Sequence, residues 1–187
     1  MNNCYLDAEA VITFFRMTGR KHIFITGSRG SGKSHLVNNM LKHMSDSFNL
    51  LQSHRTDTPQ VVIKSNLVAG NKEFVIGVPR TSGINPASKG NNMTIIEDGF
   101  INCAIPAIDT HLDTTPERLF VIDELGYLES SCIPFQKAVE KLLDNSHVLA
   151  VIRKQSTEFL NRICNRKDVL VIDIDSTFET LSCIIMA

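Results

Sequence analysis

The stretch FITGSRGSGKSHL, residues 24–36, decides the fold of this chain. It places three glycines, a lysine and a serine between a short apolar segment and a segment with helical periodicity. Residues 21–26 are apolar and partly β-branched, which predicts a strand, and residues 33–44 carry apolar side chains at helical spacing. Residues 27–34 fit the pattern GxxxxGK[ST], and they lie where that motif has to lie, after a strand and at the start of a helix.

A loop of this kind is built to bind phosphate groups. Several backbone N–H groups have to converge on one anion, which requires conformations that glycine adopts without steric cost. A helix that starts at Lys33 adds the positive end of its dipole. We expect Lys33 to contact the β- and γ-phosphate oxygens and the Ser34 hydroxyl to bind Mg²⁺. The predicted nucleotide-binding residues are Gly27, Ser28, Arg29, Gly30, Ser31, Gly32, Lys33, Ser34 and His35.

A second motif lies where the apolar run Leu119–Ile122 meets two acidic residues, Asp123 and Glu124. A nucleotide-bound Mg²⁺ needs a carboxylate from a strand near the phosphate loop, and Asp123 is our prediction for it, with Ser34 as the other metal ligand. Glu124 is placed to orient or deprotonate an attacking water, which favours hydrolysis. By itself such a pair could lie in a solvated loop, but its occurrence with an intact phosphate loop predicts a nucleoside-triphosphatase.

The remaining periodicity predicts an α/β protein. Apolar strands that alternate with helices indicate a mostly parallel sheet with helices on both faces, the three-layer architecture of P-loop NTPases. The predicted strands are residues 21–26, 119–122, 148–152 and 169–174, and the predicted helices are residues 7–17, 33–44, 98–111, 134–144 and 157–164.

Three less regular segments carry their own predictions. Val61–Val68 and Glu73–Val78 flank a turn and predict a hairpin. The helix over 98–111 contains Pro106, which should kink or interrupt it. Arg80–Asn92 is rich in Gly, Pro, Ser and Asn, and it is either a lid over the nucleotide or an ordinary loop.

Length and composition bound the rest. A chain of 187 residues suits one domain, 1–187, in which residues 1–19 form an N-terminal helical extension. We expect helix 7–17 to pack on the core, with docking of a protein partner as the alternative. The net charge of −1 gives no reason to expect nucleic acid, and no apolar run is long enough to span a membrane. Five scattered cysteines favour free thiols in a cytoplasmic protein.

With both motifs identified, the chain resembles the THEP1-type nucleoside-triphosphatases. The stretch LFVIDELGYLE, residues 119–129, is similar to the pattern VIDEIGKME of that family. The resemblance covers about residues 21–175 and is most specific at the phosphate loop, at this acidic strand and at the segment NRKDV, residues 165–169. Further similar segments are Asp98–His111, Phe135–Val139, Val151–Lys154 and Asn161–Val169.

The resemblance implies Mg²⁺-dependent hydrolysis of the terminal phosphate of several nucleoside triphosphates, ATP and GTP among them, on a RecA-like sheet. It implies catalytic roles for Lys33 and Glu124, and it suggests Arg153 as a charge near the γ-phosphate; the alternative for Arg153 is an exposed strand end. The chain departs from the family at His35, where a threonine hydroxyl is usual, and at Tyr127, which replaces a typical lysine.

Two alternatives to hydrolysis stay open from the sequence. A small kinase could pass the γ-phosphate to a nucleoside, nucleotide or metabolite, with Glu124 beside the acceptor hydroxyl. A nucleotide-dependent switch could bind a protein partner through the N-terminal helix. In addition, Asn165–Asp168 is similar to the NKxD base-reading motif of GTPases, although it carries arginine in place of the lysine, and a charged turn is the alternative.

Overall fold

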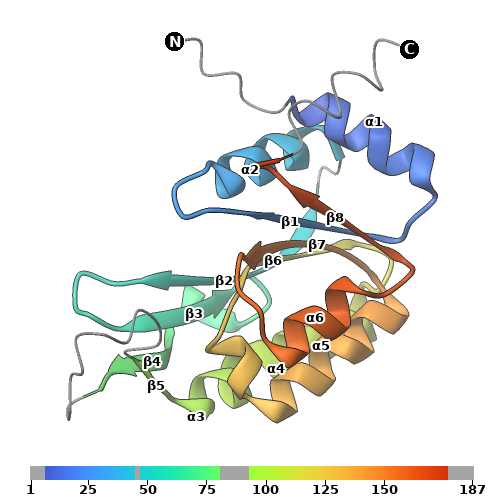
Figure 1. Ribbon diagram of the computed structural model, residues 1–187. Helices are drawn as coiled ribbons and strands as arrows, with labels where there is room; N and C mark the ends of the chain where they lie inside the picture. Colours follow the sequence, from blue (N-terminus) through green and yellow to red (C-terminus); the bar gives the residue numbers. More distant parts are fainter. Residues whose placement is uncertain (1–6, 45–46, 81–92, 177–187) are drawn as a thin grey trace.

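The computed structural model describes residues 7–44, 47–80 and 93–176, which include one eight-stranded mixed sheet (Figure 1). The strand order is β5-β4-β3-β2-β6-β7-β1-β8. The strands are β1 His22–Gly27, β2 Phe48–Arg55, β3 Val61–Ser65, β4 Phe74–Pro79, β5 Met93–Ile95, β6 Leu119–Leu125, β7 His147–Arg153 and β8 Val169–Asp173.

The sheet has a parallel part and an antiparallel part. Strands β2, β6, β7, β1 and β8 run parallel, and β3, β4 and β5 follow β2 antiparallel. The four predicted apolar strands are therefore confirmed, as is the hairpin that β3 and β4 form. The sequence analysis missed β2 and β5, so the sheet is wider than predicted. The carboxyl ends of the parallel strands all lie at the same end of the sheet. The phosphate loop after β1 and the acidic residues of β6 are therefore on the same side of the molecule.

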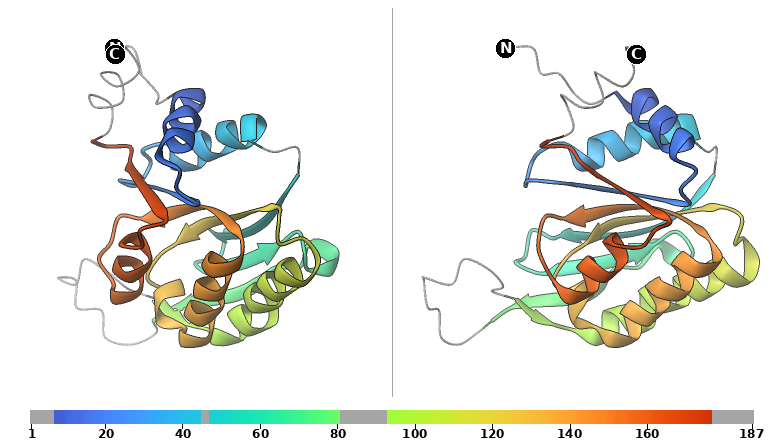
Figure 2. Two further views of the ribbon diagram at one scale, coloured as in Figure 1. Left: turned by 90° about the vertical axis from the view of Figure 1, so that its right-hand side faces the viewer. Right: turned by 45° about the vertical axis from the view of Figure 1, so that its right-hand side comes forward.

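Helices cover both faces of the parallel strands (Figure 2). One face carries α1 and α2, and the other carries α4, α5 and α6. The predicted α/β fold with helices on both faces is therefore confirmed. The helices are α1 Ala8–Thr18, α2 Lys33–Met44, α3 Glu97–Gly99, α4 Ile105–Thr114, α5 Ile133–Asn145 and α6 Glu158–Cys164.

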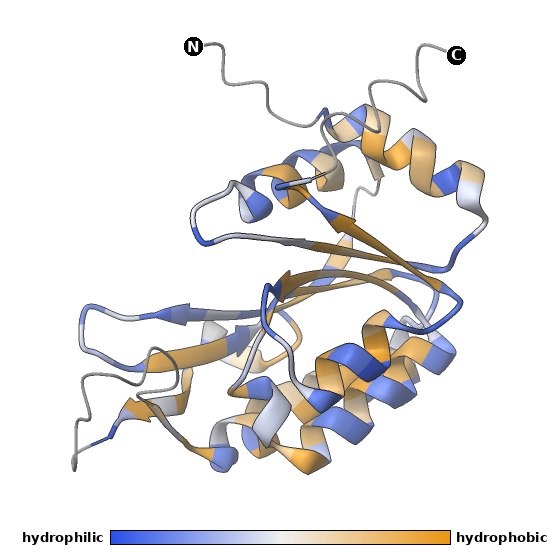
Figure 3. Ribbon diagram, viewed as in Figure 1, coloured by the Kyte–Doolittle hydropathy of each residue, from blue (hydrophilic) through white to orange (hydrophobic). Residues whose placement is uncertain are grey.

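The apolar pattern of the strands explains the two layers. Along β1, Phe24 packs in the core under α5 and α6, whereas Ile23 and Ile25 pack in the core under α1 and α2. Successive side chains of a strand point to opposite faces, so an unbroken apolar run serves both cores. Figure 3 shows these apolar strands between two layers of helices, which carry both hydrophobic and hydrophilic residues.

Helix α1 belongs to the second of these cores. Asp7 caps it by accepting a hydrogen bond from the Glu9 N–H, and Gly19 ends it in the left-handed conformation. Val11 and Ile12 are buried against the core that also holds the apolar face of α2. The packing interpretation of residues 7–17 is thus confirmed. The assignment of 1–187 to one domain stays a prediction.

Pro106 disturbs the helix over residues 97–114 less than predicted. The chain is helical throughout, but Phe100–Ala104 forms a π-helical turn between α3 and α4. Proline has no N–H with which to bond a carbonyl in the preceding turn, and a widened turn accommodates that loss. The sequence therefore located the irregularity correctly, but the prediction that Pro106 interrupts the helix is wrong.

Three of the five cysteines lie within the described residues. Cys103 and Cys132 are buried free thiols, and Cys164 is half-buried, while Cys4 and Cys183 lie outside the described residues. Burial raises the pKa of the Cys103 thiol to about 11. Among the described helices, none has the length and apolar character that a membrane crossing requires.

Candidate active site

The phosphate loop connects β1 to α2 and has the backbone that its glycines predict. Gly30 has φ of 77° and Gly32 has φ of 93°, in the region that other residues rarely adopt. A Cβ atom on Gly27 would lie 2.7 Å from a side-chain atom of Ile174 and 2.9 Å from the Ser31 hydroxyl. The loop can therefore hold its shape only with glycine at these positions.

The loop ends in the N-terminus of α2, where Lys33 and Ser34 occupy the first turn. The first N–H groups of a helix have no partner within it, so they form an anion site at the cavity floor. The Lys33 ammonium donates hydrogen bonds to the carbonyl oxygens of Gly27 and Ser28, at 3.0 and 2.8 Å. These are weak, neutral acceptors, which a nucleotide phosphate can replace.

Asp123 at the end of β6 faces the same helix start. The Ser34 hydroxyl donates to its Oδ1 atom over 3.4 Å. Burial raises the pKa of the Asp123 carboxyl, and the Ser34 hydrogen bond partly opposes this effect. One hydroxyl and one carboxylate are hard oxygen donors of the kind that Mg²⁺ accepts alongside substrate phosphates and water. The residues present therefore fit the predicted metal.

Glu124 lies beside Arg153, which ends the neighbouring strand β7. The ladder between the two strands skips Glu124, because Asp123 pairs with Val151 and Leu125 with Ile152. Such an extra residue re-aims a side chain. The Glu124 carboxylate accepts hydrogen bonds from Nε of Arg153, at 2.8 Å, and from its Nη2 atom. The predicted catalytic residues Glu124 and Arg153 are thus brought into contact.

A buried carboxylate that the sequence analysis did not single out supports this region. Glu129 accepts a hydrogen bond from the Gly126 N–H at 2.9 Å and one from the Ser53 hydroxyl at 3.2 Å. The same hydroxyl lies 3.3 Å from the carbonyl oxygen of Glu124. Burial raises the pKa of the Glu129 carboxyl. Glu129 therefore ties β2 to the turn that follows the acidic strand.

A second group of charges adjoins the start of the loop, and its member Asp175 was not singled out by the sequence analysis. Asp175 accepts hydrogen bonds from the Ser28 N–H at 2.7 Å and from its hydroxyl at 3.0 Å. Lys154 joins Asp175 to Asp173, with distances of 3.0 and 2.8 Å to the two carboxylates. These contacts connect the ends of β7 and β8 to the phosphate loop. Asp173 at the end of β8 and Asp175 two residues later are the signal that could have indicated them.

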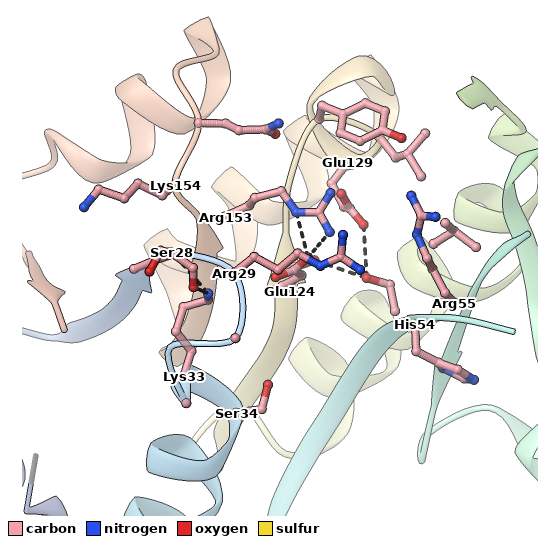
Figure 4. A pocket seen from close by; sticks show the side chains of 18 of the residues that line it. Ser28, Arg29, Lys33, Ser34, His54, Arg55, Glu124, Glu129, Arg153 and Lys154 are labelled. Atoms are coloured by element: carbon pink, nitrogen blue, oxygen red, sulfur yellow. Dashed lines mark hydrogen bonds and ion pairs between the residues drawn. The ribbon is translucent and has the colours of Figure 1, made fainter. Parts of the chain in front are cut away.

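One cavity of about 880 Å³ is lined by residues of the phosphate loop and by Lys33, Ser34, Glu124, Glu129, Arg153 and Lys154 (Figure 4). The loop forms one end of it, Glu124 and Arg153 lie in the middle, and residues of β2 and of the turn after β6 form the other end. Figure 4 shows the Arg29 side chain reaching from the loop into this space. A cavity of this size accommodates a nucleotide.

Two segments considered in the sequence analysis do not belong to the described site. Residues 81–92 lie outside the described residues, so the lid prediction is not tested. Asn165–Asp168 lies at the other end of the parallel strands from the phosphate loop. The carbonyl of Asp168 accepts a hydrogen bond from the N–H of His22, which is the first residue of β1. Arg166 pairs there with Asp144 and Asp168. The charged-turn interpretation is confirmed, and base reading by this segment is wrong.

A glycine-rich loop follows the interior parallel strand β1, a helix starts on that loop, and the acidic strand β6 lies beyond β7 in the same sheet. These features define the class of P-loop nucleoside-triphosphatases. The sequence profile of the family described as NTPase matches residues 22–179. This chain therefore belongs to that NTPase family. Helix α1 lies before the matched residues.

Individual relatives agree with this assignment. The nucleoside-triphosphatase THEP1 of Thermotoga sp. (strain RQ2) is 25% identical over 155 residues, which cover 82% of this chain and 86% of the relative. Two solved structures share the fold. THEP1 from Aquifex aeolicus has a TM-score of 0.65 at 18% identity and covers 87% of this chain and 96% of its own. A human cancer-related nucleoside triphosphatase has a TM-score of 0.60 at 19% identity. The match covers 89% of this chain and 96% of the human chain.

Proposed function

We propose that this member of the NTPase family hydrolyses the terminal phosphate of nucleoside triphosphates with Mg²⁺, yielding the diphosphate and phosphate, with broad tolerance of the base. The observation that carries the proposal is the meeting of Glu124, Arg153 and the phosphate loop in one cavity. The tolerance of the base rests on the resemblance to THEP1-type enzymes. A cytoplasmic location stays a prediction.

Each site residue has a role in this proposal. The loop N–H groups bind the phosphates, and Lys33 leaves the loop carbonyls to contact the β- and γ-phosphate oxygens. Ser34 and Asp123 would hold the Mg²⁺ ion. When bound, the ion supplies positive charge that neutralises the phosphate oxygens. Glu124 orients the attacking water and accepts its proton.

The contact of Glu124 with Arg153 gives the two residues linked roles. The Oε1 atom of Glu124 already accepts two hydrogen bonds from Arg153. A γ-phosphate offers Arg153 a more strongly charged acceptor within the same cavity. Its arrival therefore frees Glu124 for the water and brings Arg153 onto the developing phosphate charge. The ion pair thus makes the base available when substrate is present.

The test is phosphate release from ATP, GTP, CTP and UTP with Mg²⁺. Removal of a general base typically lowers the rate by about 10²–10⁴-fold, and we expect this loss for Glu124→Gln with nucleotide binding retained. Glu117→Gln changes an exposed carboxylate away from the cavity and serves as the matched control. Equal rates in wild type and Glu124→Gln would contradict the proposed role.

The same assay separates the two alternatives. Nucleotide binding without phosphate release would favour a switch, and ADP formation that depends on an added acceptor would favour a kinase. Against docking of a partner by α1, its apolar side chains Val11 and Ile12 are buried in this protein. No specific observation in the structure favours either alternative.

A further inference from the structure

The cavity continues beyond Glu124, away from the phosphate loop. Its far end is lined by Arg55 from the end of β2, Val61 from the start of β3, and Tyr127 from the turn after β6. Figure 4 shows Arg55 on the opposite side of Glu124 from Lys33. A triphosphate bound to the loop, with its γ-phosphate at Glu124, leaves this end for another molecule.

The charges at this end are positive. Burial raises the pKa of the Tyr127 phenol, and the charges of Arg153, Arg55 and Arg80 each act to lower it. The charges of these three guanidinium groups therefore act on one aromatic side chain, and the guanidinium of Arg153 lies 5.9 Å from its ring centroid. The nearby carboxylate of Glu129 is buried and already hydrogen-bonded.

The arginines differ in their partners. Arg153 is paired with Glu124. Within residues 7–44, 47–80 and 93–176, by contrast, neither Arg55 nor Arg80 forms an ion pair with a carboxylate. His54, the residue before Arg55, does have such a partner, because its Nε2 atom lies 3.3 Å from a carboxylate oxygen of Glu73. Arg55, which lines the cavity, is suited to an anionic ligand, because the forked donors of an unpaired guanidinium group match phosphate oxygens.

We propose that the far end of the cavity binds a second ligand that carries a phosphate group. Arg55 is the principal binding residue, and Arg80 and the Tyr127 hydroxyl are further donors. The inference rests on the proposed function only in placing the triphosphate at the other end. Two sources share this chemistry: a phosphomonoester such as a nucleoside monophosphate, and the inorganic phosphate that hydrolysis releases.

The experiment is a calorimetric titration in two stages. A non-hydrolysable triphosphate analogue with Mg²⁺ first saturates the phosphate loop, and AMP, GMP or inorganic phosphate is then titrated in. We expect wild type to bind at least one of these probes. Loss of a charge-assisted hydrogen bond costs about 1.5–3 kcal/mol, so Arg55→Gln should weaken this binding by about tenfold or more.

Two variants make the titration specific. Arg16→Gln removes an exposed arginine in the last turn of α1 and should leave the binding of every probe unchanged. Tyr127→Phe removes only the hydroxyl and should weaken binding less than Arg55→Gln does. Binding of a monophosphate alone identifies a phosphomonoester ligand, and binding of inorganic phosphate alone identifies a product site.

The outcomes also separate this inference from the proposed function. Failure of the analogue to bind in the first stage would contradict nucleotide binding at the loop. Saturation by the analogue followed by no binding of any probe would overturn the second site alone. Equal affinities in wild type and Arg55→Gln would overturn it as well.

Discussion

Arg153 at the end of β7 places two donor nitrogens on a single carboxylate oxygen of Glu124, with 2.8 Å from Nε to Oε1. The two residues are 29 positions apart in the chain. They meet because β6 and β7 are neighbours and parallel, so their carboxyl ends lie at the same edge of the sheet. The base and the cation that the hydrolysis mechanism needs are thus positioned by strand order.

The Arg153 side chain should be needed for turnover more than for nucleotide binding. Removing one preorganised donor from a developing oxyanion typically costs about 10²–10³ in kcat, and we expect a loss of this size for Arg153→Ala. Arg153→Lys should recover only part of it, because lysine lacks the forked donors. Steady-state phosphate release and a separate nucleotide titration measure the two effects. A change in binding affinity alone would contradict a role in catalysis.

Glu129 should contribute to stability through hydrogen bonds that it accepts. Glu129→Ala leaves the buried Gly126 N–H without its acceptor, and an unsatisfied buried group costs about 1–3 kcal/mol. The Ser53 hydroxyl also loses an acceptor, but the Glu124 carbonyl oxygen lies 3.3 Å from it. Glu129→Gln keeps an amide oxygen for one of them and should cost less. Urea unfolding gives both values. Equal stabilities of the Ala variant and wild type would show that other groups replace Glu129.

The pH dependence of stability should report His22, which is fully buried. Burial lowers its pKa from 6.5 to about 4, although Asp168, 3.4 Å away, opposes this effect. Between pH 6.5 and 4 the unfolded chain therefore binds a proton that the folded chain does not, so the free energy of unfolding falls as the pH falls. At 1.36 kcal/mol per pH unit, the contribution of His22 over this range is about 3 kcal/mol.

Unfolding of wild type and His22→Leu at several pH values between 7 and 4 measures this contribution. The slope between pH 6.5 and 4 should flatten in the variant, whereas His147→Leu, at an exposed histidine, should keep it. Protonation of Asp168 should lower the free energy of unfolding further below pH 4, because the hydrogen bond from Arg166 lowers the pKa of its carboxyl to about 2 in the folded chain. An unchanged slope in His22→Leu would assign the acid sensitivity to other groups.

Helix α1 should be needed for stability although it precedes the part of the chain that matches the family. Ile12 is 3% exposed, and truncation of such a residue costs about 2–5 kcal/mol, which we expect for Ile12→Ala. Met17 is 74% exposed, so Met17→Ala should change stability by less than about 0.5 kcal/mol. Thermal unfolding compares the two variants. Similar losses would mean that α1 is not anchored through Ile12.

Local patterns predicted the elements whose signal lies in consecutive residues. The phosphate loop was predictable because glycine spacing dictates its backbone. Strands β1, β6 and β7 were predictable because strands buried on both faces read as unbroken apolar runs. The edge strand β8 reads as an apolar run too, although its Val171 is 39% exposed. Strand β2 was not predictable from its sequence, because Asn49, Gln52 and Ser53 interrupt its apolar residues. It lies beyond β6 and gains its place by pairing with β6 and β3.

The sequence by itself determined the phosphate loop, the acidic strand and the fold class, because each depends on residue types at short, fixed spacing. Only the tertiary structure showed which distant residues meet. It brings Arg153 into contact with Glu124, lets Ser53 donate a hydrogen bond to Glu129, and places Arg55 and Tyr127 in one cavity. It also places Asn165–Asp168 at the end of the strands away from the phosphate loop. These relationships depend on strand order and register, which link residues far apart in the chain. Pairing between distant strands leaves no periodic trace in any one segment, so local patterns could not predict them.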